Sequence, residues 1–188
     1  MRVSRGQMVE NRVRILREAS RLFREHGFAA VTVADVMKAA GQTHGGFYSH
    51  FASKDDLIAA TVAAAMTGEG NGIADLETWT DAYLSPLHRD HPNQGCPTAS
   101  LAGLMRQQAP AARGAMAVGL EAQIERFAAT LPGGDHAERR RDAIGRWSAM
   151  VGAVVLARAV DDQALSDELL AETRSWLAEK ATASGTSA

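Results

Sequence analysis

The stretch from Thr32 to Lys54 constrains the fold more than any other part of this chain. Thr32 and Asp35 have the spacing of a capping box, in which the two side chains satisfy free backbone N–H groups at the start of a helix. Apolar residues then recur at helical spacing, and Gly41 can adopt the left-handed conformation that ends a helix. The pattern therefore predicts a two-turn helix between Thr32 and Gly41.

A second short helix is predicted directly after this one. Thr43 is placed to cap a helix over residues 44–50, and Ser53 with Asp56 repeats the capping-box spacing before a third helix. A helix, a three-residue turn that begins with glycine, and another helix form a helix-turn-helix, whose second helix lies in the major groove of DNA. The spacing therefore favours a DNA-binding motif, although many all-helical proteins contain short capped helix pairs of this kind.

Length and composition favour a soluble, all-α protein of one or two domains. The 188 residues are 46% hydrophobic and 22% charged, with five prolines and abundant helix-forming residues. No apolar segment reaches the roughly 18 residues that a membrane span needs, and no signal peptide is recognisable. The one cysteine, Cys96, excludes an internal disulfide and fits a reducing compartment, so a cytoplasmic location is expected.

Charge is distributed unevenly along the chain. Residues 1–60 contain nine Lys and Arg against six Asp and Glu, whereas residues 61–188 contain eleven against sixteen. A basic N-terminal third on an acidic body is typical of a protein that presents one end to a polyanion, although chance scatter gives the same pattern.

The segment Arg14–Leu57 closely resembles the DNA-binding domain of the tetracycline-repressor (TetR) family of bacterial transcription regulators. The shared positions are Leu22, Phe23, Gly27, Phe28, the Thr-Val-x-Asp-Val start at Thr32, Ala40, Gly41, Tyr48, His50, Phe51, Ser53 and Lys54. Two positions depart from the family pattern, because Met37 stands where Ala is usual and Gln42 where Val is usual. The resemblance covers about the first third of the chain.

The resemblance implies two domains built from about nine helices. A three-helix DNA-binding domain is expected over residues 1–53, and an effector-binding and dimerisation domain over 54–182, with helix 54–67 connecting the two. A disordered tail is expected at 183–188. Periodicity and breakers place the helices at 8–26, 54–67, 73–86, 98–108, 111–131, 136–160 and 164–181, with a glycine-rich break at 68–72 and a loop at 88–95.

The residues expected to contact double-stranded DNA cluster around the second helix of the motif. The set is Thr32, Thr43, His44, Gly45, Gly46, Tyr48, His50 and Lys54. His44 and the two glycines lie at the end of the helix that faces base edges. Tyr48, His50 and Lys54 resemble family positions that contact phosphates or neighbouring bases, and the two threonines can contact phosphate while they cap their helices. Two alternatives stay open: the threonines act only as caps, and the glycine pair is only a flexible turn. Phe47 and Phe51 are expected in the core.

The resemblance also implies a pocket for a small-molecule effector in the second domain. The candidate lining residues are Trp79, Tyr83, Cys96, Leu104, Met105, Met116, Leu120, Phe127 and Trp147. Their side chains favour an apolar or aromatic effector, but Met and aromatic residues at helical spacing also form ordinary cores.

The resemblance also implies a homodimer in which the last two helices pair with their copies, and two arguments support it. The last two helices contain more apolar surface than one core needs, and the candidate interface residues are Val151, Val154, Val155, Leu169, Trp176 and Leu177. In addition, one short recognition helix reads too little sequence, whereas two copies read half-sites one DNA turn apart. The alternative is an ordinary intramolecular core.

Cys96 precedes the predicted helix at Thr98, where a thiol can be reactive towards oxidants or electrophiles. A buried, inert thiol is the alternative. A metal site formed by Cys96 with His88 and His91 matches no common ligand spacing, so no metal and no cofactor are expected.

The sequence and its resemblance to the family together imply a ligand-responsive, homodimeric transcription regulator, most simply a repressor that releases a palindromic operator when its effector binds. A thiol-based repressor that acts through Cys96 is the alternative mechanism. An enzyme on an all-α scaffold is disfavoured, since the common catalytic motifs and useful carboxylate pairs are missing from the sequence. A DNA-architectural protein without an effector is the remaining alternative.

Overall fold

The computed structural model describes residues 4–67 and 75–185. Within these ranges the regular structure consists of nine α-helices and two short 3₁₀ helices without a strand, which confirms the all-α fold class. In chain order the elements are α1 (Arg5–Ala30), α2 (Val33–Ala39), η1 (His44–Ser49), α3 (Lys54–Met66), α4 (Leu76–Tyr83), α5 (Pro86–Asp90), α6 (Pro97–Leu101), η2 (Ala102–Gln107), α7 (Pro110–Ala128), α8 (His136–Ala159) and α9 (Gln163–Gly185).

The described residues form two compact units. The first contains α1, α2, η1, α3, η2 and the part of α7 up to Gly119. The second contains α4, α5, the remainder of α7, α8 and α9. Helix α3, which the sequence predicts as a connection between domains, therefore groups with the helix-turn-helix.

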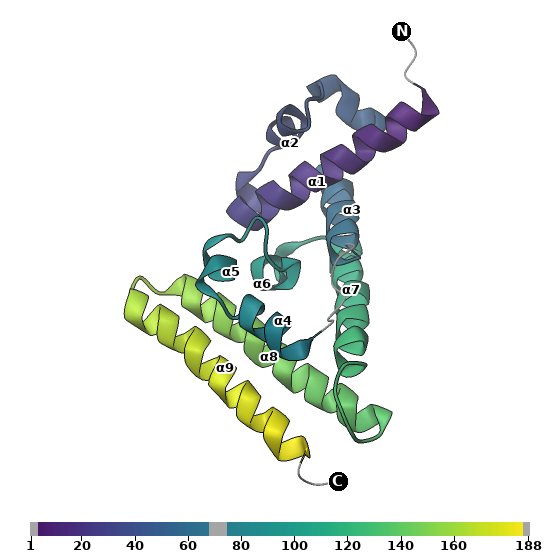
Figure 1. Ribbon diagram of the computed structural model, residues 1–188. Coiled ribbons are helices and arrows are strands. Elements are labelled where there is room, and N and C mark those ends of the chain that lie inside the picture. The colour runs from purple at the N-terminus through teal and green to yellow at the C-terminus, as the bar shows by residue number, and fades with distance from the viewer. Residues whose placement is uncertain (1–3, 68–74, 186–188) are drawn as a thin grey trace. The chain divides into compact units, whose positions relative to one another are not determined.

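In the first unit, α1 packs against both α2 and α3, and α2 packs against η1 (Figure 1). The buried side chains of this core include Ile15, Ala19, Phe23, Phe28, Val36, Met37, Phe47, Phe51, Leu57, Ile58 and Val62. The predicted end of the first helix is confirmed at Gly27, whose φ of 77° breaks the helical backbone inside α1. Phe28 then turns inward, with its ring centroid 5.1 Å from that of Phe23.

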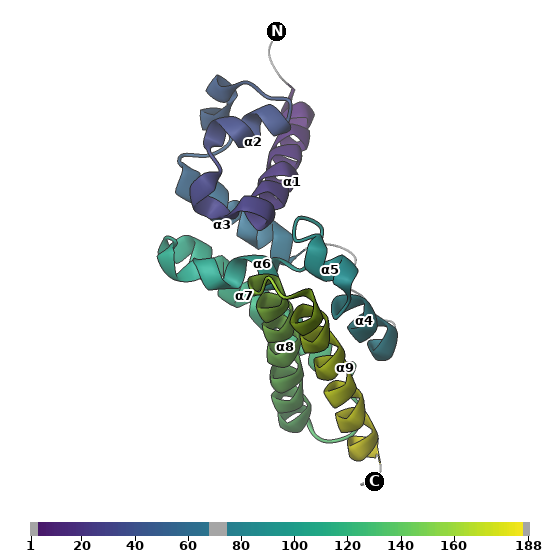
Figure 2. The same ribbon diagram turned by 90° about the vertical axis from the view of Figure 1, so that its left-hand side faces the viewer.

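In the second unit, α8 and α9 lie side by side along most of their length (Figure 2). Helix α8 begins with a complete capping box formed by Asp135 and Glu138. Helix α4 packs against α9, and α5 packs against α8. The core between them contains Tyr83, Leu84, Phe127, Leu131, Trp147, Met150, Val154, Leu170 and Leu177.

The start of α1 differs from the prediction. Ser4 caps the helix by accepting a hydrogen bond from the Gln7 N–H group, so the helix begins at Arg5 rather than at residue 8. Near this start, Val9 and Val13 are each 61% exposed although both are apolar. The buried face instead starts at Asn11, which pairs with polar partners and lies on the opposite side of the helix.

Three further predictions about the middle and end of the chain need correction. The expected loop at 88–95 begins inside a short helix, α5, because Ser85 caps it and Pro86 occupies its first turn. The helix expected at 98–108 is divided into α6 and the 3₁₀ helix η2. Helix α9 continues to Gly185, where a terminal tail was expected from residue 183. The predicted break at 68–72 lies outside the described residues.

Candidate DNA-binding surface and effector cavity

The helix-turn-helix is built as its spacing predicts. Both bonds of the Thr32–Asp35 capping box are formed, and Gly41 takes the left-handed conformation with a φ of 66°. The Gln42 N–H group donates to the Met37 carbonyl at 2.8 Å, which closes the turn. The Gln42 side chain donates to Asn11 Oδ1 at 3.3 Å, so the glutamine that replaces the usual valine is held by a polar partner on α1.

The second helix of the motif, η1, is a 3₁₀ helix rather than an α-helix. Its bonds run between residues three apart, from Gly46 N–H to Thr43 O at 3.0 Å and from His50 N–H to Phe47 O at 2.8 Å. Thr43 precedes the helix in an extended conformation, but its hydroxyl makes no cap bond, so its predicted capping role is wrong. Two adjacent glycines weaken the α-helical alternative.

Phe47 anchors η1 and leaves the opposite face in solvent. Its ring is buried and stacks on Phe51 with centroids 5.6 Å apart, which confirms both residues as core. Tyr48 beside it is 70% exposed, and His44 and Gly45 are exposed as well. An exposed aromatic side chain on a well-anchored helix is available for contact with a nucleic acid.

The remaining predicted DNA contacts surround this face. Thr32 and Thr43 are exposed, whereas Gly46, His50 and Lys54 are partly buried. The Lys54 ammonium donates to the Phe28 carbonyl at 2.6 Å, which fixes the cation at the start of α3. Ser53 caps this helix by accepting from Asp56 N–H, but the Asp56 carboxylate accepts from Ala52 N–H instead of completing a capping box.

Arg12 of α1 contacts the residues that follow η1. The helix-turn-helix motif in the sequence does not identify this arginine. Its guanidinium lies 4.3 Å from the centroid of the Phe51 ring and donates to the His50 carbonyl. Burial, together with the charge of Arg12, lowers the pKa of His50, so this histidine is neutral at pH 7. Arg12 and Lys54 therefore contribute positive charge beside the motif, together with the exposed Lys38 of α2.

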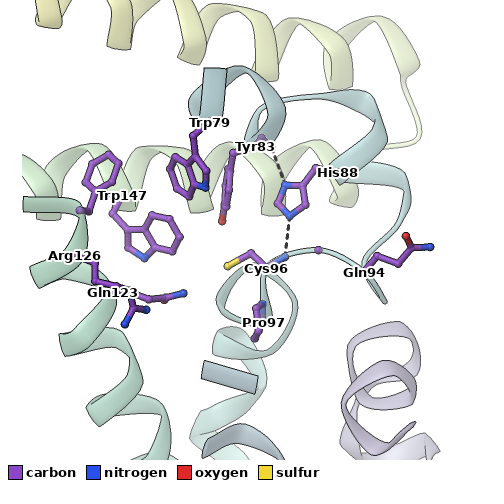
Figure 3. Close-up of a pocket in the computed structure, with 11 residues that line it drawn as sticks. Trp79, Tyr83, His88, Gln94, Cys96, Pro97, Gln123, Arg126 and Trp147 are labelled. Atoms are coloured by element: carbon purple, nitrogen blue, oxygen red, sulfur yellow. Dashed lines mark hydrogen bonds between the residues drawn. The ribbon is translucent and has the colours of Figure 1, made fainter. Parts of the chain in front are cut away.

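The second unit contains a cavity of about 230 Å³ beside an aromatic cluster (Figure 3). The indole of Trp79 stacks on that of Trp147 with centroids 5.7 Å apart, and Tyr83 and Phe127 pack around the pair. The lining residues are Trp79, Tyr83, His88, Gln94, Gly95, Cys96, Pro97, Gln123, Arg126, Phe127 and Trp147.

A histidine connects two walls of this cavity. His88 Nδ1 lies 2.7 Å from the Tyr83 carbonyl, and His88 Nε2 accepts from the Cys96 N–H group at 2.9 Å (Figure 3). Because a carbonyl only accepts and an amide N–H only donates, we assign the proton to Nδ1. Gly95 permits this approach, since a Cβ there would lie 2.6 Å from the imidazole ring.

Burial is the largest cause of the altered pKa values at this wall. It lowers the pKa of His88, and the nearby Arg158 guanidinium lowers it further against the opposing effect of the Tyr83 carbonyl. Burial also raises the pKa of Tyr83 well above its usual value, with the Cys96 thiol as the next contributor. Arg158 donates to the carbonyls of His88 and Arg89, which holds the start of this loop in place.

His88 gives the protein a testable pH dependence. Unfolded histidine binds a proton below about pH 6.5, whereas folded His88 resists protonation, so acid favours the unfolded state. We therefore expect the free energy of unfolding to fall between about pH 7.5 and pH 5.5, and to fall less in His88→Gln. Urea denaturation of both proteins at the two pH values measures this difference, and an identical pH dependence would contradict the assignment.

The structure brings together five of the nine predicted pocket residues. Trp79, Tyr83, Cys96, Phe127 and Trp147 line the cavity, and Leu120 packs against the adjoining core. The other three, Leu104, Met105 and Met116, belong to the first unit and do not line this cavity.

The polar part of the lining was not predicted. Gln123 and Arg126 lie on the same turn of α7 as Phe127, so their helical spacing was a usable signal. His88, Gln94 and the backbone around Cys96 reach the cavity through loop geometry that periodicity does not describe.

A second cavity of about 390 Å³ lies in this unit and shares Phe127 with the first. Among its lining residues are Asp75, Glu77, Asp81, Arg146 and Arg174. Its lining therefore mixes acidic and basic side chains.

In the described part of the chain no group of His, Cys, Asp and Glu could hold a metal ion. Likewise, no described helix is both long enough and apolar enough to cross a membrane.

The predicted interface residues divide into two groups. Val155 and Trp176 are 44% and 46% exposed, and Val151 and Leu169 are partly buried. Val154 and Leu177 belong to the core of the unit instead. Other large apolar side chains exposed on these two helices are Ile144, Leu156 and Leu165.

Comparison with known proteins agrees with this geometry. Residues 15–61 match the family model of bacterial regulatory proteins of the tetR family. The HTH-type transcriptional regulator YerO of Bacillus subtilis is 41% identical over 51 residues, which are 27% of this chain and 18% of YerO. The transcriptional repressor KstR2 of Mycobacterium tuberculosis is 40% identical over 53 residues, 28% of this chain and 26% of KstR2. The matched part therefore spans about a quarter or less of these relatives.

The fold is similar over a much longer part of the chain. The crystal structure of NemR from E. coli in its reduced form aligns with a TM-score of 0.70 over 88% of this chain and 94% of that chain, at 20% identity. An identity this low supports a common fold and nothing finer. The helix-turn-helix match and the common fold lead to one conclusion. Residues 15–61 belong to the helix-turn-helix domain of the tetR family of bacterial regulatory proteins, and the fold of the chain is similar to that of solved TetR-family regulators.

Proposed function

We propose that this protein regulates transcription by binding a palindromic operator as a homodimer and by releasing it when a small aromatic effector binds. The observation that supports this most directly is the surface of η1. His44, Gly45 and Tyr48 face solvent, while Phe47 and Phe51 hold the helix to the domain. This is the arrangement that a helix needs to enter a major groove.

The residues around η1 divide the contact into two kinds. His44 at the start of the helix is placed to read base edges, and backbone at Gly45 and Gly46 can approach the DNA closely. Lys54, with Thr32 and Thr43, is placed at the margin of the motif for phosphate contact. Phosphate contacts fix the position on the DNA, and base contacts select the sequence.

Two substitutions separate these roles. We expect Lys54→Ala to weaken binding to all sequences by about tenfold. We also expect the slope of log affinity against log salt concentration to decrease in magnitude by about one, because one phosphate contact is lost. We expect His44→Ala to change sequence preference instead. Selection of bound sequences from a random DNA pool, followed by titration at several salt concentrations, measures both effects. Unchanged nonspecific binding in Lys54→Ala would show that this lysine does not contact phosphate.

A dimer supplies the second half-site contact. The exposed apolar residues Val155 and Trp176, continued by Leu165 and Leu169, leave an apolar surface on α8 and α9 that water disfavours. Pairing of this surface with its copy buries it, and two recognition helices about 34–36 Å apart then fit successive turns of DNA.

The pairing surface can be tested without DNA. Val155→Asp places a charge where an apolar contact is proposed, and an unpaired buried charge costs about 3–5 kcal/mol. We therefore expect a shift from dimer to monomer at micromolar concentration in analytical ultracentrifugation. Leu87→Asp is the matched control. Leu87 is also apolar and exposed, but it lies on α5, so this substitution should leave the assembly unchanged. A dimeric Val155→Asp protein would exclude this surface.

Helix α7 offers a path from effector to DNA-binding unit. Its first part approaches α3 at Gly119, and its later residues Gln123 and Phe127 line the cavity. A ligand that shifts these later residues acts on a helix that also packs in the first unit, because a helix moves as a stiff element.

A thiol-based mechanism is a second candidate, favoured by the place of Cys96. This free, partly exposed cysteine lines the cavity, and the Tyr83 hydroxyl and the Arg158 guanidinium lie close enough to interact with it. Modification of the thiol then replaces ligand binding as the signal. Loss of DNA binding with hydrogen peroxide that disappears in Cys96→Ser supports this mechanism, and equal loss in both proteins excludes it.

A further inference from the structure

The cavity beside the aromatic cluster contains two polar atoms that the protein itself does not satisfy. Tyr83 and Trp147 are 7% and 6% exposed. Among the described residues, neither the Tyr83 hydroxyl nor the Trp147 Nε1–H group has a hydrogen-bond partner. An unsatisfied buried polar group costs about 1–3 kcal/mol, so such a pair in one cavity needs an explanation.

Both atoms belong to residues that line the cavity. In Figure 3 the Tyr83 hydroxyl is directed towards Cys96, and the indole nitrogen of Trp147 is directed towards the Gln123 and Arg126 side chains. The Cys96 sulfur is only a weak acceptor, which leaves the hydroxyl proton without a good partner.

Several other polar groups of the lining are also donors or are already hydrogen-bonded. Gln123 Oε1 accepts from Thr98 Oγ1 at 2.9 Å, so the amide nitrogen is its remaining polar end. Both imidazole nitrogens of His88 are engaged by backbone groups. Arg126 adds a cation, and none of the described residues that line the cavity is acidic.

This donor character persists at neutral pH. The pKa of Tyr83 is raised by burial, so its hydroxyl keeps its proton, and an indole N–H group never acts as an acceptor. The second cavity differs, because the carboxylates of Asp75, Glu77 and Asp81 are among its lining residues. The first cavity is thus the one suited to a ligand rich in acceptor oxygens.

We propose that this cavity binds a small aromatic carboxylate. Its ring lies against the aromatic wall of Trp79, Phe127 and Trp147, and its carboxylate accepts hydrogen bonds from Trp147 Nε1–H and Tyr83 Oη–H, with Arg126 supplying opposite charge. This deepens the proposed function, on which its regulatory meaning rests. A cavity of about 150 Å³ accommodates benzene, so about 230 Å³ has room for one substituted ring.

The ligand class is tested by isothermal titration calorimetry on the full chain without DNA. Benzoate is the probe, benzyl alcohol is the control that keeps the ring without the charge, and cyclohexanecarboxylate keeps the charge without the aromatic ring. We expect benzoate to bind at least tenfold more tightly than either control, since hydrogen bonds to a charged group are the stronger ones. No benzoate binding, or equal binding of benzoate and benzyl alcohol, would overturn the proposal.

Two variants test the named atoms. Tyr83→Phe and Trp147→Phe remove the hydroxyl and the indole N–H but keep an aromatic ring, and each is expected to weaken benzoate binding about tenfold. Because the removed atoms are unpartnered, neither variant is expected to lower the melting temperature through a lost hydrogen bond. Trp147→Phe also removes ring volume and can therefore be unstable. In that case the benzoate affinity of Tyr83→Phe decides the test. Arg126→Gln, at an exposed position, tests the charge with little risk to folding.

Leu87→Ala serves as the control variant, because this exposed leucine of α5 does not line the cavity. Wild-type affinity in Tyr83→Phe and Arg126→Gln would contradict the assigned site. The calorimetry contains no DNA, so its failure leaves the DNA-binding function intact. Conversely, benzoate binding without any change in operator affinity supports the site and contradicts its regulatory role.

Discussion

Gly45→Glu is expected to reduce operator affinity by about a hundredfold or more while leaving the protein folded. Gly45 is exposed on η1, and among the described residues no atom lies within 4 Å of a Cβ added there. The new side chain therefore fits, but it places a carboxylate on the surface proposed to face DNA. Juxtaposed like charges cost several kcal/mol, and in a dimer both half-sites suffer. Fluorescence anisotropy with operator DNA gives the affinity.

Gly114→Glu is the matched control for this experiment. Gly114 lies on α7, is exposed, and likewise has open space around an added Cβ within the described structure. The variant changes the net charge of the protein by the same amount, so a general electrostatic effect appears equally in both. Wild-type affinity in Gly45→Glu, or equal losses in the two variants, would exclude η1 as the recognition element.

Gly119→Ala is expected to destabilise the protein by about 1–3 kcal/mol. A Cβ at this buried position would lie 2.3 Å from Met66 Cβ and 2.7 Å from Met66 Cγ, so α3 and α7 must separate to admit it. The base of the methionine side chain cannot move away independently of its helix, because Cβ is fixed to the backbone. Urea denaturation of the variant and of the wild type measures the loss.

Gly114→Ala provides the comparison within the same helix. It makes the same chemical change with no contact in the described structure, and alanine is favoured over glycine in a helix by about 0.8–1 kcal/mol. The two substitutions should therefore shift stability in opposite directions. If Gly119→Ala were as stable as Gly114→Ala, the close approach of α7 to α3 would not exist in solution.

Local sequence signals were sufficient for the helix-turn-helix. The cap at Thr32, the left-handed turn at Gly41 and the buried pair Phe47 and Phe51 are each determined by residues within a few positions of one another. Propensity and capping act over this range, so the motif can be predicted before any tertiary contact is known.

Tertiary contacts determine which apolar residues of a helix are buried, and the sequence pattern alone did not predict this. Val9 and Val13 are apolar, but each is 61% exposed while Ile15 on the same helix is buried, so hydrophobicity alone does not identify the buried face of α1. Periodicity likewise placed Val154 on an external face, although it packs in the core of its own unit. A heptad-like pattern does not tell an intramolecular partner from an intermolecular one.

The lining of the cavity could be predicted only in part from the sequence. Aromatic residues such as Trp79 and Trp147 stand out in a chain with few of them, so they could be nominated individually. The hydrogen bond from Cys96 N–H to His88 depends on a loop between them and on a glycine that admits the ring. Within the described structure the polar atoms of Tyr83 and Trp147 lack a hydrogen-bond partner, and no sequence pattern predicts this.

Sequence-selective binding to DNA is the central claim, and fluorescence anisotropy of the full chain on DNA from immediately upstream of its own gene tests it most directly. The titration is run at several salt concentrations against a scrambled duplex of the same length and composition. We expect tight binding to the upstream DNA, a decrease in affinity as salt rises, and at least a thousandfold preference over the scrambled duplex. Equal binding to both duplexes at every salt concentration would contradict the claim that the chain reads an operator there.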